Sequence, residues 1–555
     1  MKNYLLFFVV ITCFQCKKQD ASTVIPVTPE PLTLSSAKVD NLFAVSNNFY
    51  PTSLNPIIKI SFSAPIDHST VDNNLSFIGV TGNNIAHSIS YANNDSLLII
   101  NTDAQLSPLT KYNINLLTGL QSTNHGNLSA YSSYTLITQI DSTDKFPQLT
   151  DSVLLDLVQR QTFKYFWDFG HPVSGMARER NSSGDLVTTG GTGFGIMAIP
   201  VAVKRNFITR ADGLSRILQI VNFYQNNCTA YHGAYAHWIN GATGATIPFS
   251  TQDNGADLVE TSYLMEGLIT ARQYFNSTTD AVEIDLRTKI NQLLDAVEWN
   301  WFRKSGENVL YWHWSPDMGF VINAQVSGWD EALITYVMAA SSQTNAIPKV
   351  VYDNGWARNG GIVNNNSYYT YQLPLGPGNG GPLFFEHYSF LGINPNGLTD
   401  TYANYQTQTT NHTKINYEYC KANPQHWNGY SNLCWGLTAS DVPGGYNANE
   451  PNNDPGVISP TAALSSMPYT PQESLNALRF FYYKLGDKLW GQYGFYDAFK
   501  LSDPWFANST LAIDQGPIIV MIENYRSGML WNLFTSAPEI KSGMLALGFT
   551  APYLN

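Results

Sequence analysis

Residues 250–275 read STQDNGADLVETSYLMEGLITARQYF and decide the fold of the larger part of the chain. Leu, Met, Ala, Val and Ile give this stretch a high helix propensity. Its apolar residues occur all the way round rather than in one stripe, which is typical of a helix buried in a large protein. The stretch therefore predicts a buried helix over 252–275, inside a domain in which helices surround other helices.

Three acids open this helix. Asp253, Asp257 and Glu260 are spaced i, i+4 and i+7, so all three share one narrow face if the helix begins by Asp253. An unpaired buried charge is costly, which favours a functional use for the acids. The alternative is that they complement the helix dipole and form one buried ion pair. The spacing alone leaves both interpretations open.

The chain begins with an expected export signal. Residues 4–12 form an apolar run that is too short to span a bilayer and has the form of a signal peptide. A cysteine directly after such a run indicates lipid attachment, at Cys16 because a polar stretch follows it, or alternatively at Cys13. We expect a signal peptide over 1–16, a Pro, Thr and Ser-rich linker over 17–33, and a lipid anchor on the bacterial outer membrane as the one membrane contact.

Composition narrows the range of partners. The net charge is −12 with 30 Lys and Arg among 555 residues, which argues against a nucleic-acid partner. Aromatic residues make up 13% of the chain, and their flat faces suit sugar rings as well as cores. Apart from the two N-terminal cysteines, the odd set Cys228, Cys420 and Cys434 argues against a disulfide framework or a zinc site. A pair between Cys420 and Cys434 stays open. We expect a monomer without cofactor or metal.

Residues 34–141 have a β texture. The segments 58–62 and 112–116 alternate apolar and polar residues, and Asn, Gly, Asp and Pro separate the strands at regular intervals. The order ISFSAPID followed by LSPLTKY resembles bacterial Ig-like domains that accompany surface enzymes. We therefore expect a small all-β Ig-like sandwich without catalytic residues.

From residue 147 to 555 the texture is helical. About a dozen helices joined by long Gly, Asn and Pro-rich loops predict an all-α (α/α)6 barrel, with the loops 353–383 and 440–470 on one rim. The predicted helices are 151–168, 192–206, 210–227, 252–275, 280–302, 328–341, 384–391, 399–422, 430–438, 471–485, 517–526 and 528–534.

A second acidic site is Glu331, in the segment VSGWDEAL. Asp330 has a structural explanation, because it can complete a near capping box with Ser327. Glu331 leads directly into the apolar segment 332–340. A helix N-terminus favours its ionised form, whereas apolar neighbours would raise its pKa, so structural and catalytic roles both stay open.

The third acidic site is the segment AIDQGPIIVMIENYR. Asp514 stands in apolar company upstream of Pro517, where an acid must be hydrogen-bonded or functional. Glu523 and Arg526 are candidate substrate-binding residues, but their i, i+3 spacing suits a plain ion pair as well.

Aromatic and histidine residues in the remaining loops predict a sugar cleft. The candidates for stacking on and hydrogen bonding to sugars are His237, Trp238, Trp314, His387 and Tyr388. No two histidines stand at i, i+4 with an acid nearby, which argues against a metal site. The chain also has neither a phosphate-binding glycine loop before a helix nor a G-x-S-x-G elbow.

Residues 148–555 resemble the bacterial "putative glucoamylase" domain, and specifically glycoside hydrolase family 144, the β-1,2-glucanases. The matching stretches are TQDNGADLVETSYL, WHWSPDMGF, VSGWDEALITYVMA, GPLFFEHYSFLGI, HWNGYSNLCWGLTASD and AIDQGPIIVMIENYRSGMLW. The resemblance implies an (α/α)6 barrel, no metal and inversion at the anomeric carbon. It also implies Glu331 as general acid, Asp514 as general base, and Asp253, Asp257 and Glu260 along the cleft. Endo or exo action stays open.

The leading hypothesis is thus an inverting glycosidase acting on a neutral β-glucan, above all β-1,2-glucan or its oligosaccharides. One rival is a lipid-anchored glycan-binding protein without catalysis, and another is a hydrolase of a different glucan linkage. A polysaccharide lyase fits less well, because such enzymes usually need a basic groove and this chain is acidic.

Overall fold

The computed structural model describes residues 28–554, which fold into two compact units. The first covers most of the chain up to Thr135, and the second runs from Leu136 onward and takes in Tyr50–Leu54 and Leu106–Lys111. The expected signal peptide, Cys16 and most of the expected linker lie outside the described residues. Among residues 28–554, no helix has both the length and the apolar character that crossing a membrane requires.

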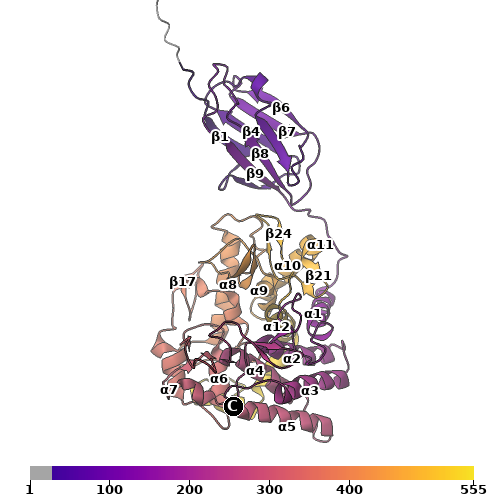
Figure 1. Cartoon of the computed structure of the whole chain (residues 1–555), viewed down its shortest axis with the longest axis vertical. Coiled ribbons are helices and arrows are strands. Elements are labelled where there is room, and N and C mark those ends of the chain that lie inside the picture. Colours follow the sequence, from indigo (N-terminus) through magenta and orange to yellow (C-terminus); the bar gives the residue numbers. More distant parts are fainter. Residues whose placement is uncertain (1–27, 555) are drawn as a thin grey trace, which may run out of the picture. The chain divides into compact units, whose positions relative to one another are not determined.

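The first unit is a β-sandwich (Figure 1). In the five-stranded sheet, β4 pairs antiparallel with β1 and β7, and in the four-stranded sheet β5 pairs antiparallel with β8. Ile58, Ile60 and Phe62 of β4 point into the core, whereas Ile57 on the same strand is exposed, as the alternating sequence predicted. The Ig-like sandwich is therefore confirmed. Its sheets have the orders β2 (Leu42–Phe43), β1 (Leu34–Val39), β4 (Ile57–Phe62), β7 (Leu97–Thr102), β6 (His87–Ala92), and β3 (Asn48–Thr52), β9 (Ser132–Thr138), β8 (Lys111–Leu116), β5 (Leu75–Gly79).

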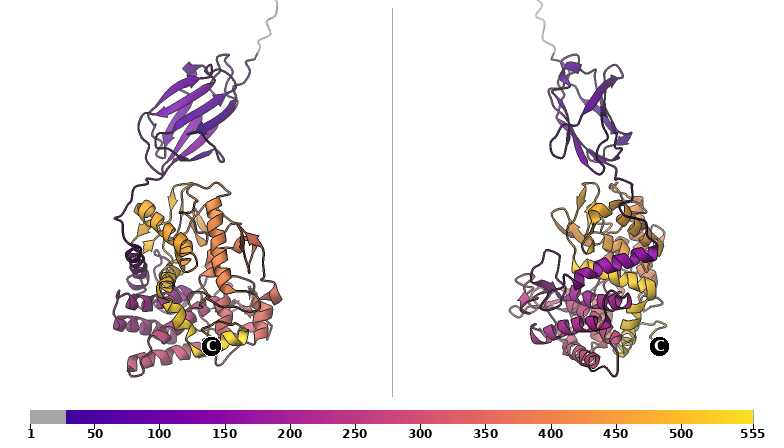
Figure 2. Two further views of the ribbon diagram at one scale, coloured as in Figure 1. Left: turned by 180° about the vertical axis from the view of Figure 1, so that it is seen from behind. Right: turned by 90° about the vertical axis from the view of Figure 1, so that its right-hand side faces the viewer.

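The second unit is built from helices with short strands at their ends, shown from two further sides in Figure 2. Its helices are α1 (Asp151–Trp167), α2 (Thr189–Lys204), α3 (Arg210–Asn226), α4 (Leu258–Tyr274), α5 (Ala281–Ala296), α6 (Leu333–Ser341), α7 (Lys349–Val351), α8 (Tyr405–Ala422), α9 (Pro460–Ser465), α10 (Pro471–Arg479), α11 (Leu485–Leu489), α12 (Ala512–Ser527), α13 (Met529–Thr535) and α14 (Pro538–Leu547). The strands that border the site below are β10 (Leu186–Thr188), β11 (Trp238–Asn240), β12 (Thr246–Ile247), β13 (Ala256–Asp257), β15 (His313–Trp314), β19 (Ala439–Val442) and β20 (Gly445–Ala448).

Buried helices form the inside of this unit. Helix α2 packs against α4 and α12, α4 packs against α6, and α12 packs against α9. Helices α2, α4 and α12 are buried on nearly every side, whereas α3 and α5 bury one face. Gly193 and Gly267 allow α2 and α4 to approach closely, because a Cβ at Gly193 would lie 2.2 Å from the Tyr263 carbonyl oxygen. The predicted helical domain, with apolar inner helices and amphipathic outer ones, is confirmed.

Several element boundaries differ from the prediction. Helix α4 begins at Leu258 rather than 252, because the Asp257 carboxylate caps it by accepting from the Glu260 N–H at 2.9 Å. Helix α12 begins at Ala512, so Pro517 lies inside it. No helix forms over 430–438, where Gly436 has a φ of 127°. Helices α9 and α14 were not predicted.

Two smaller expectations are also corrected. Ser327 does not cap α6, since its hydroxyl donates to the Gly355 carbonyl oxygen at 2.6 Å and α6 begins only at Leu333. Cys420 and Cys434 are buried free thiols, so the pairing that the sequence left open does not form in this structure.

Candidate active site

One cavity of about 610 Å³ in the helical unit lies at the N-terminal ends of four inner helices, α2, α4, α6 and α12, and is lined by residues of their first turns or directly before them. Helix N-termini favour negative charge, so carboxylates are well placed at this end of the barrel. The size suits a sugar-binding pocket. The cavity is lined by Glu179, Arg180, Thr188, His237, Trp238, Phe249, Asp253, Asp257, Val259, Glu260, Tyr263, Trp312, His313, Glu331, Phe384, Tyr388, Ala439, Tyr446, Ala448, Leu511 and Ile513.

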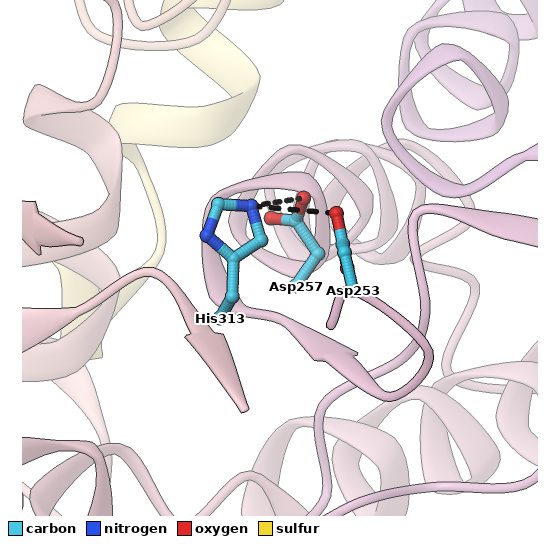
Figure 3. Close-up of side chains that lie close together, drawn as sticks. All are labelled: Asp253, Asp257 and His313. Carbon is cyan, nitrogen blue, oxygen red and sulfur yellow. Dashed lines mark ion pairs between the residues drawn. The ribbon is translucent and has the colours of Figure 1, made fainter. Parts of the chain in front are cut away.

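One wall of the cavity holds two aspartates and two histidines. Asp257 Oδ2 lies 3.1 Å from His237 Nδ1 and 3.7 Å from His313 Nε2, and Asp253 Oδ2 lies 3.6 Å from the same His313 atom. Figure 3 shows His313 reaching across to both carboxylates. The loop before α4 brings Asp253 close to Asp257. The two aspartates are therefore neighbours, but they do not share a helix face as the spacing had predicted.

The charges on this wall are interdependent. Burial works against a charged His237, but the carboxylates of Glu260 and Asp257 outweigh it and raise its pKa to about 9. Burial alone would also raise the pKa of Asp257, yet the hydrogen bond and charge of His237 and the charge of His313 hold it below its ordinary value. Burial and the Asp257 charge raise the pKa of Asp253. The wall therefore holds an ionised Asp257 beside a protonated His237 at neutral pH.

Asp253, Asp257 and His313 could also hold a cation, because one ligand atom from each lies within 4.8 Å of the others. His237 works against this use. Its imidazolium already occupies an oxygen of Asp257 and would repel a metal ion at close range. Among the described residues, this is the one group of three or more His, Cys, Asp or Glu with ligand-like spacing.

Glu260 is fixed by the start of helix α2. Its Oε2 accepts from the Gly190 N–H at 2.6 Å and from the Thr188 hydroxyl at 3.3 Å. Burial raises the pKa of Glu260, while the Gly190 and Thr188 hydrogen bonds act in the opposite direction. These contacts favour a positioning role over a free acid, because both donors prefer a carboxylate.

Glu331 has a different environment. It lies immediately before α6 and is partly exposed, and its carboxyl group lines the cavity. Its backbone carbonyl accepts from Ser389 and Tyr263, but no described side chain donates to its carboxyl group. Burial, and then the neighbouring Asp330, raise the pKa of Glu331 well above its ordinary value. Desolvation therefore outweighs the helix N-terminus and favours the protonated form of Glu331, the form that a general acid requires.

Asp514 belongs to a second acidic group. It lies in the first turn of α12, is 2% exposed, and is absent from the cavity lining although its neighbours Leu511 and Ile513 line it. Burial, and then Asp497, raise the pKa of Asp514 well above its ordinary value. Burial raises the pKa of Asp497 to about 7. Asp514 is therefore placed one layer behind the wall of the cavity.

An ion-pair network lies beside this group. Arg180 pairs with Glu179 at 2.9 Å and with Asp441 at 3.3 Å, and the Ser509 hydroxyl donates to Asp441. Asp441 connects the network to the second acidic group, because its backbone N–H donates to Asp497 Oδ2 at 2.6 Å. Arg180 thus supplies positive charge close to several buried carboxyl groups.

Aromatic rings form the apolar surface of the site. Phe249 is 52% exposed and its ring centre lies 4.5 Å from that of Trp238, and Tyr446 on strand β20 is 50% exposed. Tyr388 and Tyr263 pack edge to face deeper in the cavity, with ring centres 5.8 Å apart. Exposed rings beside carboxylates are the combination that binds sugars, by stacking on their apolar faces and accepting from their hydroxyls.

Two predicted sugar-binding residues lie elsewhere. Trp314 follows His313 on β15, but its ring packs against Trp301 and His232 at 5.4 and 5.1 Å and does not line the cavity. His387 is 1% exposed, and its Nε2 lies 3.0 Å from the Ser466 hydroxyl. Burial lowers the pKa of His387 to about 3. Neither residue lines the cavity.

Glu523 and Arg526 are also placed outside the site. They follow Asp514 on α12 by nine and twelve residues, which is roughly 14 Å or more along the helix. Glu523 is fully buried and accepts from Arg205 at 2.7 and 2.9 Å, whereas Arg526 pairs with Asp156. Both residues are ion-paired, as the alternative interpretation predicted, but with Arg205 and Asp156 rather than with each other.

Several site residues were not predicted from the sequence. Glu179 and Arg180 stand in a loop without hydrophobic periodicity, and Asp497 lies between short strands, so neither position carries a pattern signal. His313 lies between Trp312 and Trp314 in the sequence, but its contact with Asp257 depends on the antiparallel pairing of β13 with β15. That pairing is a long-range feature that local spacing does not reveal.

Family models and relatives match both units. Residues 323–538 match the family described as "Putative glucoamylase", and residues 32–138 match "Bacterial Ig-like domain". A Bacteroides uniformis structure described as a "putative glucoamylase" is 54% identical, with a TM-score of 0.73 over 74% of this chain and 100% of its own. An endo-β-1,2-glucanase structure from Chitinophaga pinensis is 48% identical, with a TM-score of 0.71 over 73% of this chain and 100% of its own.

A curated relative extends the comparison. The exo-β-1,2-glucooligosaccharide sophorohydrolase (non-reducing end) of Parabacteroides distasonis is 45% identical over 418 residues, which are 71% of this chain. The match spans 58% of the length of that relative. The family expected from the sequence motifs is confirmed by these matches: the chain belongs to the bacterial glucoamylase-like family, the group of glycoside hydrolase family 144.

Proposed function

We propose that the protein is a monomeric glycoside hydrolase that cleaves β-1,2-glucan or its oligosaccharides with inversion. The observation that carries the proposal is Glu331, a partly exposed residue whose carboxyl group has a raised pKa and lines the cavity, and to which no other side chain among the described residues donates. A group that is protonated, accessible to a ligand and free of other partners is suited to proton donation. The β-1,2 linkage comes from the relatives, which include an endo-β-1,2-glucanase and an exo-acting sophorohydrolase.

In this mechanism, Glu331 donates its proton to the glycosidic oxygen as that oxygen leaves the anomeric carbon. Asp514 takes a proton from the water that attacks the opposite face of the sugar. In inverting glycosidases the acid and base usually stand about 6.5–9.5 Å apart to admit this water. Because Asp514 lies behind the cavity wall, the proton can instead pass through a further water or a sugar hydroxyl.

The other cavity residues bind and orient the sugar. Asp253 and Asp257 accept from its hydroxyls, and Glu260 holds the start of α2 against this wall. His237 supplies a positive counter-charge, while Trp238 and Phe249 offer apolar faces for stacking. These groups bind through shape and hydrogen bonds to uncharged hydroxyls, as a neutral glucan requires.

The test is an activity screen with the mature chain. Linear β-1,2-, β-1,3-, β-1,4- and α-1,4-glucans are incubated separately, and new reducing ends and product lengths are measured. We expect reducing ends from β-1,2-glucan alone, and the product lengths will distinguish endo from exo action. Binding of β-1,2-glucan without new reducing ends would favour a glycan-capture protein, and release from another linkage would correct the substrate.

We further propose that the protein is exported and lipid-anchored to the outer membrane through Cys16. The support is the sequence of the N-terminal segment, with its apolar run before a cysteine and a polar linker after it. Cells fed an alkyne fatty acid should label the wild-type chain and not Cys16→Ser. Labelling that persists in Cys16→Ser and disappears in Cys13→Ser would move the site to Cys13.

A further inference from the structure

The carboxyl groups of Asp497 and Asp514 lie within hydrogen-bonding reach of each other, behind the wall of the cavity. Both are buried, with 3% and 2% of their surface exposed. Each has one fully buried oxygen that no donor of the described residues reaches, Oδ1 of Asp497 and Oδ2 of Asp514. Two orphaned oxygens on adjoining carboxyl groups are explained together if they face one another.

Two ionised carboxylates cannot form this contact, because each would offer only acceptors and the like charges would repel in a buried site. A single proton between them removes both difficulties, as one carboxyl group then donates to the other. The arrangement is therefore satisfied with one negative charge and one proton for the pair.

The surroundings indicate which partner carries the charge. Asp497 Oδ2 accepts from the Asp441 N–H at 2.6 Å, and Arg180 lies close enough to favour the ionised form of Asp497. The Asp441 charge disfavours the ionised form of both carboxyl groups, but Asp514 is disfavoured by Glu179 as well and lies near the phenols of Tyr388 and Tyr446. The proton therefore resides on Asp514, which donates to Asp497.

We propose that Asp497 and Asp514 work as one base, in which Asp497 is the positioning residue that receives the proton Asp514 gives up. This inference rests on the proposed hydrolase function. As water attacks the anomeric carbon, its O–H bond breaks and its proton passes to the bridging water or sugar hydroxyl, which in turn gives one proton to Asp514 Oδ1. The proton on Asp514 Oδ2 passes at the same time to Asp497 Oδ1. The pair changes from one negative charge to neutral, while Glu331 loses the proton that the leaving oxygen gains.

The backbone of Asp497 is held for this task. Its N–H donates to the Ser509 carbonyl oxygen at 2.9 Å, and its own carbonyl oxygen accepts from the Ser459 hydroxyl at 2.8 Å. Such fixed geometry keeps the two carboxyl groups in contact without a reorganisation step.

The first test is spectroscopic and needs no substrate. The infrared carbonyl band of protonated carboxylic acids is compared at neutral pH in the wild-type chain, Asp497→Asn, Asp514→Asn and the double variant. A shared proton on Asp514 predicts that Asp514→Asn loses one acid group and that the double variant loses no more than Asp514→Asn. Glu266→Gln, which removes a separate buried glutamate with raised pKa, is the control for the loss of one independent group.

The second test is kinetic. Asp497→Asn should lower kcat by at least roughly 10-fold and as much as the roughly 10²–10⁴-fold of a lost general base, with KM little changed. The Asp497→Asn/Asp514→Asn double variant should be no slower than Asp514→Asn, because residues that act as a unit are non-additive. Asp497→Asn keeps an acceptor for the Asp441 N–H. If the Asp497→Asn variant still fails to fold, the infrared band lost in Asp514→Asn is the remaining test.

Four results would overturn the proposal. They are full activity in Asp497→Asn, losses that multiply in the double variant, two acid bands lost in the double variant, and no band lost in Asp514→Asn. A wild-type chain that cleaves no glucan but shows the expected bands would refute the proposed function and leave the shared proton established.

Discussion

Nδ1 of His237 lies 3.1 Å from Oδ2 of Asp257, and this contact joins the strand-bordering loop before β11 to the cap of the central helix α4. His237 lines the cavity and at the same time contacts the cap of an inner helix. The site is therefore coupled to the stability of the helical unit through a titratable pair.

The pair makes stability dependent on pH. The folded-state pKa of His237 is raised to about 9, above the ordinary value of 6.5. Its stabilising contribution is therefore fully present below about pH 6.5 and is lost as the pH rises through about 9. His237→Gln should lower the free energy of unfolding at pH 6, and the gap to the wild type should shrink markedly by pH 10. Urea titrations at both pH values measure the free energy of unfolding of each chain. A difference between wild type and His237→Gln that is the same at pH 6 and pH 10 would contradict the charged pair.

Glu331→Gln tests the proposed acid. The amide keeps the shape of the side chain but has no proton to give to the leaving oxygen. We expect kcat to fall roughly 10²–10⁴-fold, about 3–5 kcal/mol of barrier, with the fold and oligosaccharide binding retained. Initial rates on β-1,2-glucan and isothermal binding measurements separate the two effects. Glu260→Gln is the informative comparison, because an inactive Glu260→Gln beside an active Glu331→Gln would place the acid on helix α4.

Asp257→Asn should have a smaller effect on turnover. The Asn side chain can still cap the Glu260 N–H, but it carries no charge for His237 and His313. We expect weaker substrate binding, seen as a rise in KM of roughly 10-fold, and a smaller loss in kcat than in Glu331→Gln. Asp257→Ala should lose the cap as well and be about 1 kcal/mol less stable than Asp257→Asn. Equal unfolding midpoints for the two variants would show that the cap contributes nothing.

The sequence predicts what depends on local patterns. The all-round apolar character of 258–274 identifies an inner helix, and the acids at its start identify the end of the barrel that holds the site. The spacing argument for Asp253 was wrong in detail. Helix α4 begins directly after its N-cap residue Asp257, so Asp253 lies in the preceding loop and not on the helix. Asp253 reaches the cavity through the turn that follows Ser250, and a helical pattern does not predict such a turn.

Positions fixed by long-range packing could not be predicted. Asp497 and Asp514 are seventeen residues apart and come together only when the short strands before α12 fold onto its first turn. Trp314 and His313 are neighbours in a stretch rich in aromatic residues, yet strand pairing sends His313 into the cavity and leaves Trp314 against Trp301. Composition identified the stretch, and only the tertiary structure separates its members.

The Ig-like unit is expected to be a spacer. The cavity is lined wholly by residues between 179 and 513, so none of it comes from strands β1 to β9. A truncated chain should begin at Asp141, because Lys145 N–H donates to the Tyr483 carbonyl oxygen at 2.7 Å and the Leu149 N–H donates to its hydroxyl at 2.9 Å. Its kcat on short β-1,2-oligosaccharides should stay within about twofold of the full chain. A large fall in a folded truncation would show that the first unit contributes to the site.

The buried pair Glu386 and His412 should stabilise the helical unit more than an exposed ion pair does. Nδ1 of His412 lies 2.8 Å from Glu386 Oε1, and Nε2 lies 2.9 Å from the Gly381 carbonyl oxygen. The Gly381 carbonyl oxygen can only accept, so Nε2 donates to it, while Nδ1 shares a hydrogen bond with Glu386 Oε1. Trp329 and Gln408 also donate to Glu386 Oε1, and both members of the pair are fully buried.

Glu386→Gln removes one partner of this fully buried pair. Removing one partner of such a pair costs about 3–5 kcal/mol, whereas an exposed pair contributes about 0–1 kcal/mol. Asp285→Asn, which breaks the exposed i, i+4 pair with Lys289 on α5, is the matched control. Urea unfolding followed by far-ultraviolet circular dichroism should show a loss several-fold larger in Glu386→Gln than in Asp285→Asn. Losses within about 1 kcal/mol of each other would show that the buried pair stabilises the fold no more than the exposed pair does.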